Sequence, residues 1–551
     1  MREFNEQSNE ERKALMHAVG VEWGDMERPL IGIINSWNEL NPGHYHFKSV
    51  IALIKDAVYK CGGLAVELPV IGVCDGFCSN TSGDRYTLPT RDLVAGEVQT
   101  LADLNLLDGM ILLSSCDKIV PGMLMGAMMV NIPTVMLTGG FMQPGRVDGQ
   151  IVTLGSTKKV FASYKSGEIS KEKYEELIRN SCSGPGTCPF MGTANTMCAA
   201  AEILGFSPHG NASVAACSKE WQEMAVECGE KIMELYRKGI KAREVVSLEG
   251  FYNTIRYCMA TGGSTNSLLH IPAIAGQAGF KIQPSDFDRI SAEIPVISTI
   301  YPNKKEITMK EFSEAGGLPA VVKELYNAGK FKDTPGCFET IKEKCEKAVN
   351  LNPEIIHKVE DPINPHGGLA VLHGNIGTLS AIVKFSAVDE TCFKFTGHAK
   401  IFNSQADAYD AGMKDQLKKG DVVVIRYEGP KGSPGMPHLS SFMGVVVGKH
   451  LDKDLALITD GRFSGSTSGL AVGHVSPEAY EGGNIGLLQD GDIIDIDIKA
   501  RTLTARVSDR EFEERRKNFK PIEKPSSGWL QVFKEKATSA HQGATIYSMK
   551  K

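Results

Sequence analysis

The sequence predicts an α/β protein, with a doubly wound first domain built on a parallel sheet and a β-rich, barrel-like second domain. Three observations support this prediction. Apolar runs alternate with amphipathic segments over residues 29–140, and strand-like runs dominate after Asp361. The length of 551 residues exceeds what one hydrophobic core usually organises. We therefore expect two domains, over residues 1–360 and 361–551.

The first domain is expected to alternate strands with helices. In chain order the strands are expected within 29–37, 63–74, 108–116 and 132–140, and the helices between them within 47–62, 91–105 and 122–131. Such units bury a parallel sheet under helices on both faces, and ligands then bind beyond the carboxyl ends of the strands. Cys74, Asp75, Cys116 and Asp117 each follow a strand, so they could share one crevice.

Residues 158–350 are richer in helical patterns and are expected to complete the first domain. The pattern breaks into Pro, Asn and Gly over residues 351–368. After this break the strands are expected to lack intervening helices. They are predicted within 420–429, 442–449, 454–461, 492–499 and 502–508.

Composition and charge narrow the class of protein. Hydrophobic residues make up 42% and charged residues 23%, as in an ordinary soluble globular protein. The net charge of -6 includes no block of like charges, so a nucleic-acid partner is not expected. Residues 1–20 lack the apolar core of a secretory signal, and Asn131 and Pro133 interrupt the most apolar stretch. We expect a cytoplasmic protein without a membrane partner.

The 13 cysteines are an odd number in a chain without an export signal, which favours free thiols and metal ligands over disulfides. Cys116, Asp117 and Lys118 end a very apolar strand, where charged groups are costly to bury without partners. The alternative is a buried free cysteine beside a helix-capping Asp, which explains Cys116 and Asp117 alone equally well.

A second group of thiols, Cys182 and Cys188, surrounds a Gly-Pro-Gly turn before a predicted helix. Iron–sulfur clusters use such thiolates. A zinc site would usually show C-x2-C pairs, whereas Cys74 and Cys78 are spaced C-x3-C and Cys182 and Cys188 are spaced C-x5-C. Zinc is therefore the less natural alternative.

A glycine-flanked serine, Ser464, leaves a strand of the second domain and enters a loop rich in hydroxyl groups. A flexible turn is the simplest interpretation, because a serine without a nearby His is usually not a nucleophile. A metal or another electrophile would be needed to make Ser464 a base.

Over almost its whole length, the chain resembles the family of dihydroxy-acid, phosphogluconate and sugar-acid dehydratases. The motifs that carry the resemblance are CDKIVPGM, RYTLPTRDL, GTCPFMGTANTM, ATGGSTNSLLH, VVIRYEGPKGSPGMP and ITDGRFSGSTSGLAVGHVSPEA. The resemblance implies an iron–sulfur cluster (2Fe-2S or 4Fe-4S) that acts as a Lewis acid, a Mg2+ ion held partly by a carboxylated lysine, and a homodimer or homotetramer.

The family's functional residues fall on matching positions of this chain. By motif, Cys116 and Cys188 resemble cluster ligands, and Asp75, Asp117 and Lys118 resemble the magnesium side of the site. Ser464 matches the family's proton acceptor, so Ser464 and Lys118 are the expected catalytic residues.

The chain departs from the family at one cluster ligand. Gly43 stands where many members supply a third cysteine, after an Asn-Pro pair. Phosphogluconate dehydratases instead carry a cysteine before an Asp-Gly pair, and Cys74 matches it. We therefore expect Cys74 as the third ligand, with Cys78 in reserve. The nearby His44 could contact the substrate or the cluster, or could serve at the surface or as a helix cap.

A second departure concerns the metal. His438 stands where the family has a metal-binding Glu, and the Glu usual near Ser82 is absent. Imidazole is a poorer ligand than carboxylate for a hard cation, so His438 would shift the preference from Mg2+ somewhat toward Mn2+, Fe2+ or Zn2+.

The resemblance implies that the partner is a small dihydroxy acid, which loses water to become a 2-keto acid. Motifs of the second domain favour the dihydroxy acids of branched-chain amino acid synthesis, whereas Cys74 favours a sugar acid such as gluconate, phosphogluconate or a pentonate. A non-catalytic iron–sulfur paralogue is the third alternative, although the retained Ser464 and Lys118 argue against it.

Overall fold

A four-stranded parallel sheet organises the N-terminal region of the computed structural model, which describes residues 6–304, 306–463 and 469–549. The strand order is β2-β1-β3-β4, with β1 (Leu30–Asn35), β2 (Leu64–Pro69), β3 (Gly109–Ser114) and β4 (Thr134–Thr138). Every residue of β1, β3 and β4 is buried, as expected for a sheet that is covered on both faces.

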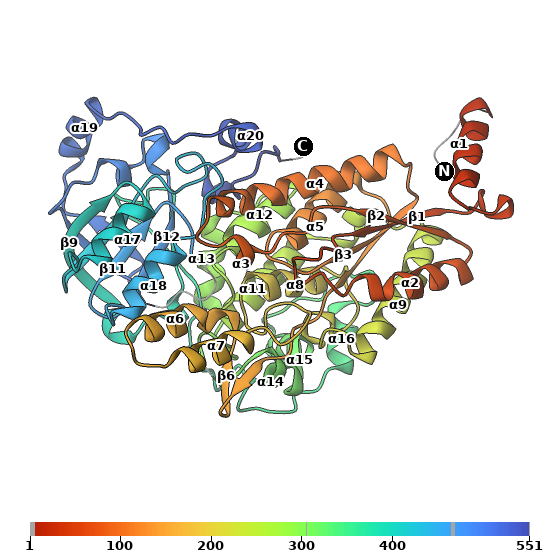
Figure 1. Ribbon diagram of the computed structural model, residues 1–551, viewed down its shortest axis with the longest axis horizontal. Helices are drawn as coiled ribbons and strands as arrows, with labels where there is room; N and C mark the ends of the chain where they lie inside the picture. Colours follow the sequence, from red (N-terminus) through yellow and green to blue (C-terminus); the bar gives the residue numbers. More distant parts are fainter. Residues whose placement is uncertain (1–5, 305, 464–468, 550–551) are drawn as a thin grey trace.

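Helices cover this sheet from both sides. The crossover helices are α2 (Lys48–Lys60), α4 (Thr87–Leu104) and α5 (Ile119–Val130). In Figure 1, α4 lies above the strands and α2 lies below them together with α9 (Lys219–Lys238), which packs against α2, β3 and β4. The predicted strand-helix alternation and the doubly wound arrangement are confirmed.

The segment that follows β4 is mainly helical, as predicted. A short hairpin pairs β5 (Gly145–Val147) with β6 (Gln150–Val152). The remaining helices of the N-terminal region are α1 (Glu6–Ala18), α3 (Asp75–Cys78), α6 (Thr157–Lys165), α7 (Lys171–Arg179), α8 (Thr193–Ile203), α10 (Ala242–Val245), α11 (Leu248–Thr261), α12 (Ser267–Gln277), α13 (Pro284–Glu293), α14 (Met309–Glu314), α15 (Gly317–Asn327) and α16 (Ile341–Lys347). None of the described helices is long and apolar enough to cross a membrane.

The C-terminal region forms a nearly closed, eight-stranded barrel. Its order is β14-β13-β9-β10-β11-β12-β8-β7. The strands are β7 (Ala370–Leu372), β8 (Ser380–Val383), β9 (Lys394–Phe402), β10 (Asp421–Ile425), β11 (Ala456–Thr459), β12 (Ala471–Ser476), β13 (Ile493–Asp497) and β14 (Thr502–Ala505). The two edge strands meet because His373 donates its N–H to Arg501 O at 2.9 Å and accepts from Leu503 N–H at 2.9 Å. The barrel-like prediction is confirmed.

One expected strand of the barrel is wrong. The run 442–449 belongs to the helix α18 (Ser440–Gly448), and α17 (Gln405–Met413) lies between β9 and β10. Valine-rich runs favour strands, but β9, β10 and β11 pair in parallel, and parallel neighbours need a crossover. Two further helices, α19 (Asp509–Lys517) and α20 (Gly528–Lys536), follow the barrel.

Strand β10 is buried on both faces because helices cover the barrel on this side. Val422 and Val424 belong to the apolar cluster that fills the barrel. Val423 and Ile425 alternate with them and pack in a separate cluster with Phe442 of α18. The unbroken apolar run of β10 therefore reflects two cores, one on each face.

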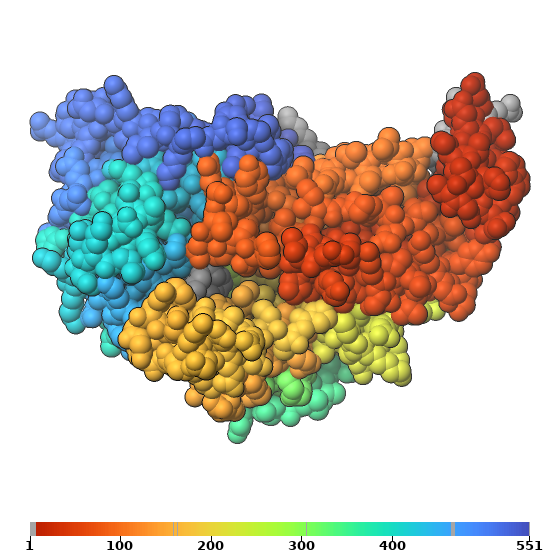
Figure 2. All heavy atoms as spheres, in the orientation of Figure 1, coloured from red at the N-terminus to blue at the C-terminus, as the bar shows by residue number. Residues whose placement is uncertain are grey.

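The N-terminal half of α4 joins the two regions of the chain. Arg91 is fully buried and donates to Gly543 O at 2.9 Å and to Ala544 O at 2.7 Å. Asp92 accepts the N–H of Ile546 at 2.7 Å. In Figure 2 the cyan and blue C-terminal region adjoins the orange segment that carries α4, as well as the gold segment of α6 and α7. This junction brings loops of the barrel to the end of the parallel sheet.

Candidate active site

Three charged residues gather where β2 and β3 end. Asp75 begins α3 after β2, whereas Asp117 and Lys118 connect β3 to α5. Because the carboxyl ends of parallel strands lie at one edge of a sheet, the residues meet. Lys118 Nζ is fully buried, 2.7 Å from Asp75 Oδ2 and 3.4 Å from Asp117 Oδ2. The crevice expected from the sequence is present.

The barrel adds an imidazole to this group. His438 precedes α18, and its Nε2 atom lies 3.7 Å from Asp75 Oδ2. One donor atom each from Asp75, Asp117 and His438 lies within 4.8 Å of the other two. Asp75 Oδ1 is buried and has no hydrogen-bond partner within the described ranges. A cluster of two carboxylates and an imidazole with an unpartnered oxygen fits a divalent cation.

The surrounding cations keep Asp75 ionised. Burial acts to raise the pKa of Asp75, but the positive charges of Lys118 and Arg462 outweigh this effect and hold the pKa below its usual value. The carboxylate is therefore charged at neutral pH, which is the form that a metal ion needs.

Three of the predicted thiols lie near one another beside the charged group. Burial raises the pKa of Cys74 to about 11, and it raises the pKa of Cys116 and Cys188 well above the usual value of a thiol. Asn41 accepts from the Cys116 thiol at 3.3 Å and donates at 3.0 Å to the backbone oxygen of the residue before Cys74. The residues that precede Cys116 and Cys188 share a hydrogen bond between their hydroxyl groups. Three partly buried cysteine thiols on segments held together in this way suit an iron–sulfur cluster.

The two other cysteines weighed from the sequence differ in placement. Cys182 is exposed. The thiol of Cys78 points back into its own helix, where it donates to Cys74 O at 3.8 Å and to Asp75 O at 3.7 Å. Both are thus less suited than Cys74 to join Cys116 and Cys188.

Gly43, the position of the missing cysteine, lies against this thiol group. A Cβ atom built on Gly43 would lie 2.8 Å from Cys116 Sγ and 3.2 Å from Asn41 Oδ1. The Asn41 oxygen in turn accepts from the Cys116 thiol at 3.3 Å. The departure therefore concerns a residue that contacts the thiol group directly.

His44 orients the loop of Cys116. Its Nε2 atom accepts the backbone N–H groups of Ser115 at 3.2 Å and Cys116 at 3.1 Å, and its Nδ1 donates to Ser36 O at 2.9 Å. Burial lowers the pKa of His44 to about 3, so the ring is neutral and can accept at Nε2. The side chain is fully buried, so a surface role is wrong.

One pocket of about 270 Å³ connects the two groups. Its lining is Asp75, Gly76, Ser79, Asn80, Asp117, Leu154, Gly155, Thr157, Cys188, Phe190, Gly192, Thr193, Ala194, His438 and Ser440. A small carboxylic acid that enters it would meet the carboxylates, the imidazole and a thiol together. Ser464 lies outside the described residues, but Arg462, two positions before it, is fully buried beside His438.

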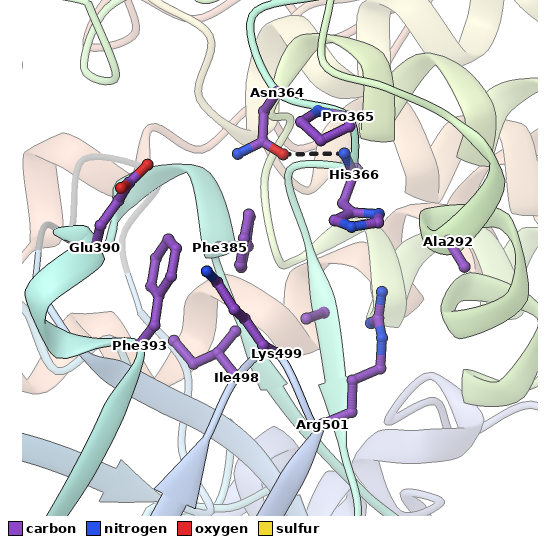
Figure 3. A pocket seen from close by; sticks show the side chains of 12 residues that line it. Ala292, Asn364, Pro365, His366, Phe385, Glu390, Phe393, Ile498, Lys499 and Arg501 are labelled. Carbon is purple, nitrogen blue, oxygen red and sulfur yellow. Dashed lines mark hydrogen bonds between the residues drawn. The ribbon is translucent and has the colours of Figure 1, made fainter.

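A larger cavity of about 440 Å³ holds none of the predicted site residues (Figure 3). It lies between the segment of Asn364 and His366 and the barrel loop of Lys499 and Arg501. Arg501 is paired there with Asp288 at 2.6 Å. The smaller pocket is therefore the candidate active site.

The sequence analysis did not predict two residues that contact His438, namely Asp84 and Arg462. Asp84 accepts from His438 Nδ1 at 3.1 Å, and Arg462 NH1 lies 2.5 Å from His438 Nε2. Both residues stand within or beside family motifs, but neither has a spacing that indicates a ligand. Only the junction of the two regions brings them to His438.

The comparisons with known proteins agree with this architecture. The family model described as dihydroxy-acid/6-phosphogluconate dehydratase N-terminal matches residues 28–374, and the corresponding C-terminal model matches residues 354–544. Proteins named dihydroxy-acid dehydratase are 41% identical over 536 residues in Methanococcoides burtonii and 40% identical over 536 residues in Pyrococcus furiosus. Each alignment covers 97% of both chains.

The fold, the site and these matches define an enzyme of the hydro-lyase class. The chain belongs to the dihydroxy-acid/6-phosphogluconate dehydratase family.

Proposed function

We propose that this chain removes water from a 2,3-dihydroxy carboxylic acid to give a 2-keto acid, most like the dihydroxy-acid dehydratase of branched-chain amino acid synthesis. One observation carries the proposal: Asp75, Asp117, His438 and Cys188 line the same pocket, so a metal-binding group and a thiol group face one substrate-sized space. The names of the relatives support the same reaction.

The cofactors belong to this proposal. Asp75, Asp117, His438 and a carboxylated Lys118 would hold Mg2+ or Mn2+, and Cys74, Cys116 and Cys188 would hold an iron–sulfur cluster. When bound, the ion would neutralise charge at the carboxylate end of the substrate, and the cluster would act as a Lewis acid toward the leaving hydroxyl group.

The remaining steps of the proposed reaction are proton transfers and the loss of the hydroxyl group. Ser464 accepts the proton from C2, and the C2–C3 double bond forms as the C3–O bond breaks. The hydroxyl group leaves as water after it gains a proton from solvent, and Ser464 later returns the proton from C2 to solvent. The resulting enol takes up a proton at C3 and loses the proton of its C2 hydroxyl, which yields the 2-keto acid. The buried Lys118 pairs with Asp75 at 2.7 Å and holds its carboxylate at the pocket.

The pocket combines apolar and polar side chains. Leu154 and Phe190 can pack against a branched aliphatic chain, whereas polar side chains such as Asn80 and Thr193 can bind hydroxyl groups. The preference for a branched-chain substrate therefore rests on the names of the relatives. Cys74, the feature shared with phosphogluconate dehydratases, favours a sugar acid instead. The assembly as a homodimer or homotetramer rests on the family resemblance, and the cytoplasmic location remains an expectation from the sequence.

A substrate panel tests the proposal. Anaerobically purified protein is incubated with Mg2+ or Mn2+ and with 2,3-dihydroxyisovalerate, gluconate, 6-phosphogluconate or a pentonate, and 2-keto acid is measured as its hydrazone. We expect product from 2,3-dihydroxyisovalerate first. Product from a sugar acid alone would assign the second function. No product from any substrate, despite a full cluster, would make the chain a non-catalytic iron–sulfur paralogue.

A further inference from the structure

Asp84 holds His438 across the junction between the two regions. Asp84 belongs to the short helical turn Ser82–Tyr86 before α4, whereas His438 comes from the barrel. Asp84 Oδ1 lies 3.1 Å from His438 Nδ1, and Asp84 Oδ2 accepts the backbone N–H of His438 at 3.3 Å. Both side chains are buried. Two contacts from one carboxylate fix both the position and the ring orientation of His438.

The partners of the imidazole define its tautomer. Arg462 NH1 lies 2.5 Å from His438 Nε2, and a guanidinium group can only donate, so Nε2 is the acceptor. The ring proton is then on Nδ1, where it is donated to Asp84. The lone pair of Nε2 consequently faces Arg462 NH1, and Asp75 Oδ2 lies 3.7 Å from the same Nε2 atom. A neutral imidazole with this lone pair is the form that binds metal ions.

Arg462 lies at the edge of the same group. Its NH1 atom is 4.0 Å from Asp75 Oδ2. The guanidinium group is also anchored by Met436 O and by Thr87 Oγ1, each at 2.5 Å. It would therefore keep two anchors if it gave up the contact with Nε2. A metal ion between Asp75 and His438 would take over that lone pair.

We propose that Asp84 is the positioning residue of the metal centre: it holds His438 as the Nδ1–H tautomer so that Nε2 binds the ion, and Arg462 releases Nε2 when the ion arrives. The inference rests on the proposed function, because that proposal supplies the ion. Asp84, His438 and the ion then form a carboxylate–histidine–metal chain, which raises the basicity of the ligand. A nitrogen ligand in this chain favours Mn2+ over Mg2+ relative to an all-oxygen site.

Binding of Mn2+ alone to full-length protein under anaerobic conditions tests the inference. Electron paramagnetic resonance measures free Mn2+ and hence affinity, and electron spin-echo modulation detects nitrogen coupled to the bound ion. We expect nitrogen coupling in the unsubstituted protein and its loss in His438→Glu. Asp84→Asn should weaken Mn2+ binding about 10- to 100-fold. In the His438→Glu background, Asp84→Asn should not weaken binding, because a carboxylate ligand has no tautomer to fix.

Asp108→Asn is the matched control, since Asp108 accepts the N–H of Leu30 at 2.9 Å at the opposite end of the sheet. It should leave Mn2+ affinity unchanged. Equal affinity for Asp84→Asn and the unsubstituted protein would overturn the inference, as would protein-bound Mn2+ without nitrogen coupling. The measurement of nitrogen coupling on the unsubstituted protein still tests the inference if Asp84→Asn fails to fold. Neither measurement needs turnover. Nitrogen-coupled Mn2+ without formation of 2-keto acid would contradict only the proposed function. Formation of 2-keto acid without nitrogen coupling would contradict only this inference.

Discussion

A Cβ atom built on Gly43 would lie 2.8 Å from the Sγ atom of Cys116, closer than real Cβ atoms approach their neighbours. The position where many members of the family place a cluster cysteine is thus adjacent to the thiol group of this chain. Glycine leaves Cys116 Sγ room to lie beside Asn41. In our proposal Cys74 supplies the third ligand in place of a cysteine at position 43.

Restoring a side chain at this position should disturb the cluster. Gly43→Ala would force Cys116 Sγ or Asn41 to shift by several tenths of an ångström, and we expect the iron content after anaerobic reconstitution to fall by about half or more because core packing resists such shifts. Gly24→Ala is the control, since a Cβ there meets no atom within 4 Å. Equal iron content in both variants would show that Gly43 does not constrain the cluster.

The assignment of the cluster ligands predicts which cysteine variants lose the iron–sulfur cluster. Cys116→Ser, Cys188→Ser and Cys74→Ser should lose the visible absorbance of the cluster, because each removes a thiolate ligand. The exposed Cys182→Ser should retain it. Visible spectra of anaerobically purified variants, with iron and sulfide analysis, check the pattern. A full cluster in Cys74→Ser would show that the third ligand lies elsewhere, and Cys78→Ser would then be the next variant to measure.

Ser464→Ala separates proton transfer from cofactor binding. If Ser464 accepts the proton from C2, kcat should fall about 10²- to 10⁴-fold, while iron and Mn2+ contents stay unchanged. Ser466→Ala, a neighbouring hydroxyl group in the same motif, is the control and should retain activity. Retention of kcat in Ser464→Ala would mean that another group takes the proton.

The buried histidine His474 of β12 makes stability depend on pH. Its ring nitrogens have no hydrogen-bond partner among the described residues, and burial lowers its pKa to about 3. The unfolded chain binds a proton near pH 6.5 and the folded chain does not, so this contribution to stability is present above pH 6.5 and is lost as the pH falls. At pH 5.5 the loss should be about 1.4 kcal/mol.

Urea unfolding at pH 7.5 and pH 5.5 checks this value. In His474→Asn the drop in the free energy of unfolding should shrink by about that amount. His398→Asn changes an exposed histidine and should leave the drop as it is. An unchanged drop in His474→Asn would show that other groups cause the pH dependence.

The hydrophobic pattern and the order of the elements along the chain predicted much of the fold and part of the candidate site. The apolar runs of β1, β3 and β4, and the placement of Cys116 and Asp117 after β3, follow from periodicity and from the geometry of parallel sheets. The valine-rich run 442–449 was predicted as a strand because propensity cannot show that β10 and β11 need a crossover. Asp84 and Arg462 could not be predicted, because each gains its role only through packing against His438.

The most direct test of the proposed dehydration is the product formed from 2,3-dihydroxyisovalerate in D2O by the anaerobically purified protein with Mn2+. Because the C3 proton of the product comes from solvent when the enol tautomerises, we expect 2-ketoisovalerate that carries one deuterium at C3, seen by mass spectrometry at the earliest time points. Product without deuterium at C3 would contradict the enol route, and the absence of 2-keto acid despite full occupancy of cluster and metal would contradict the dehydratase assignment itself.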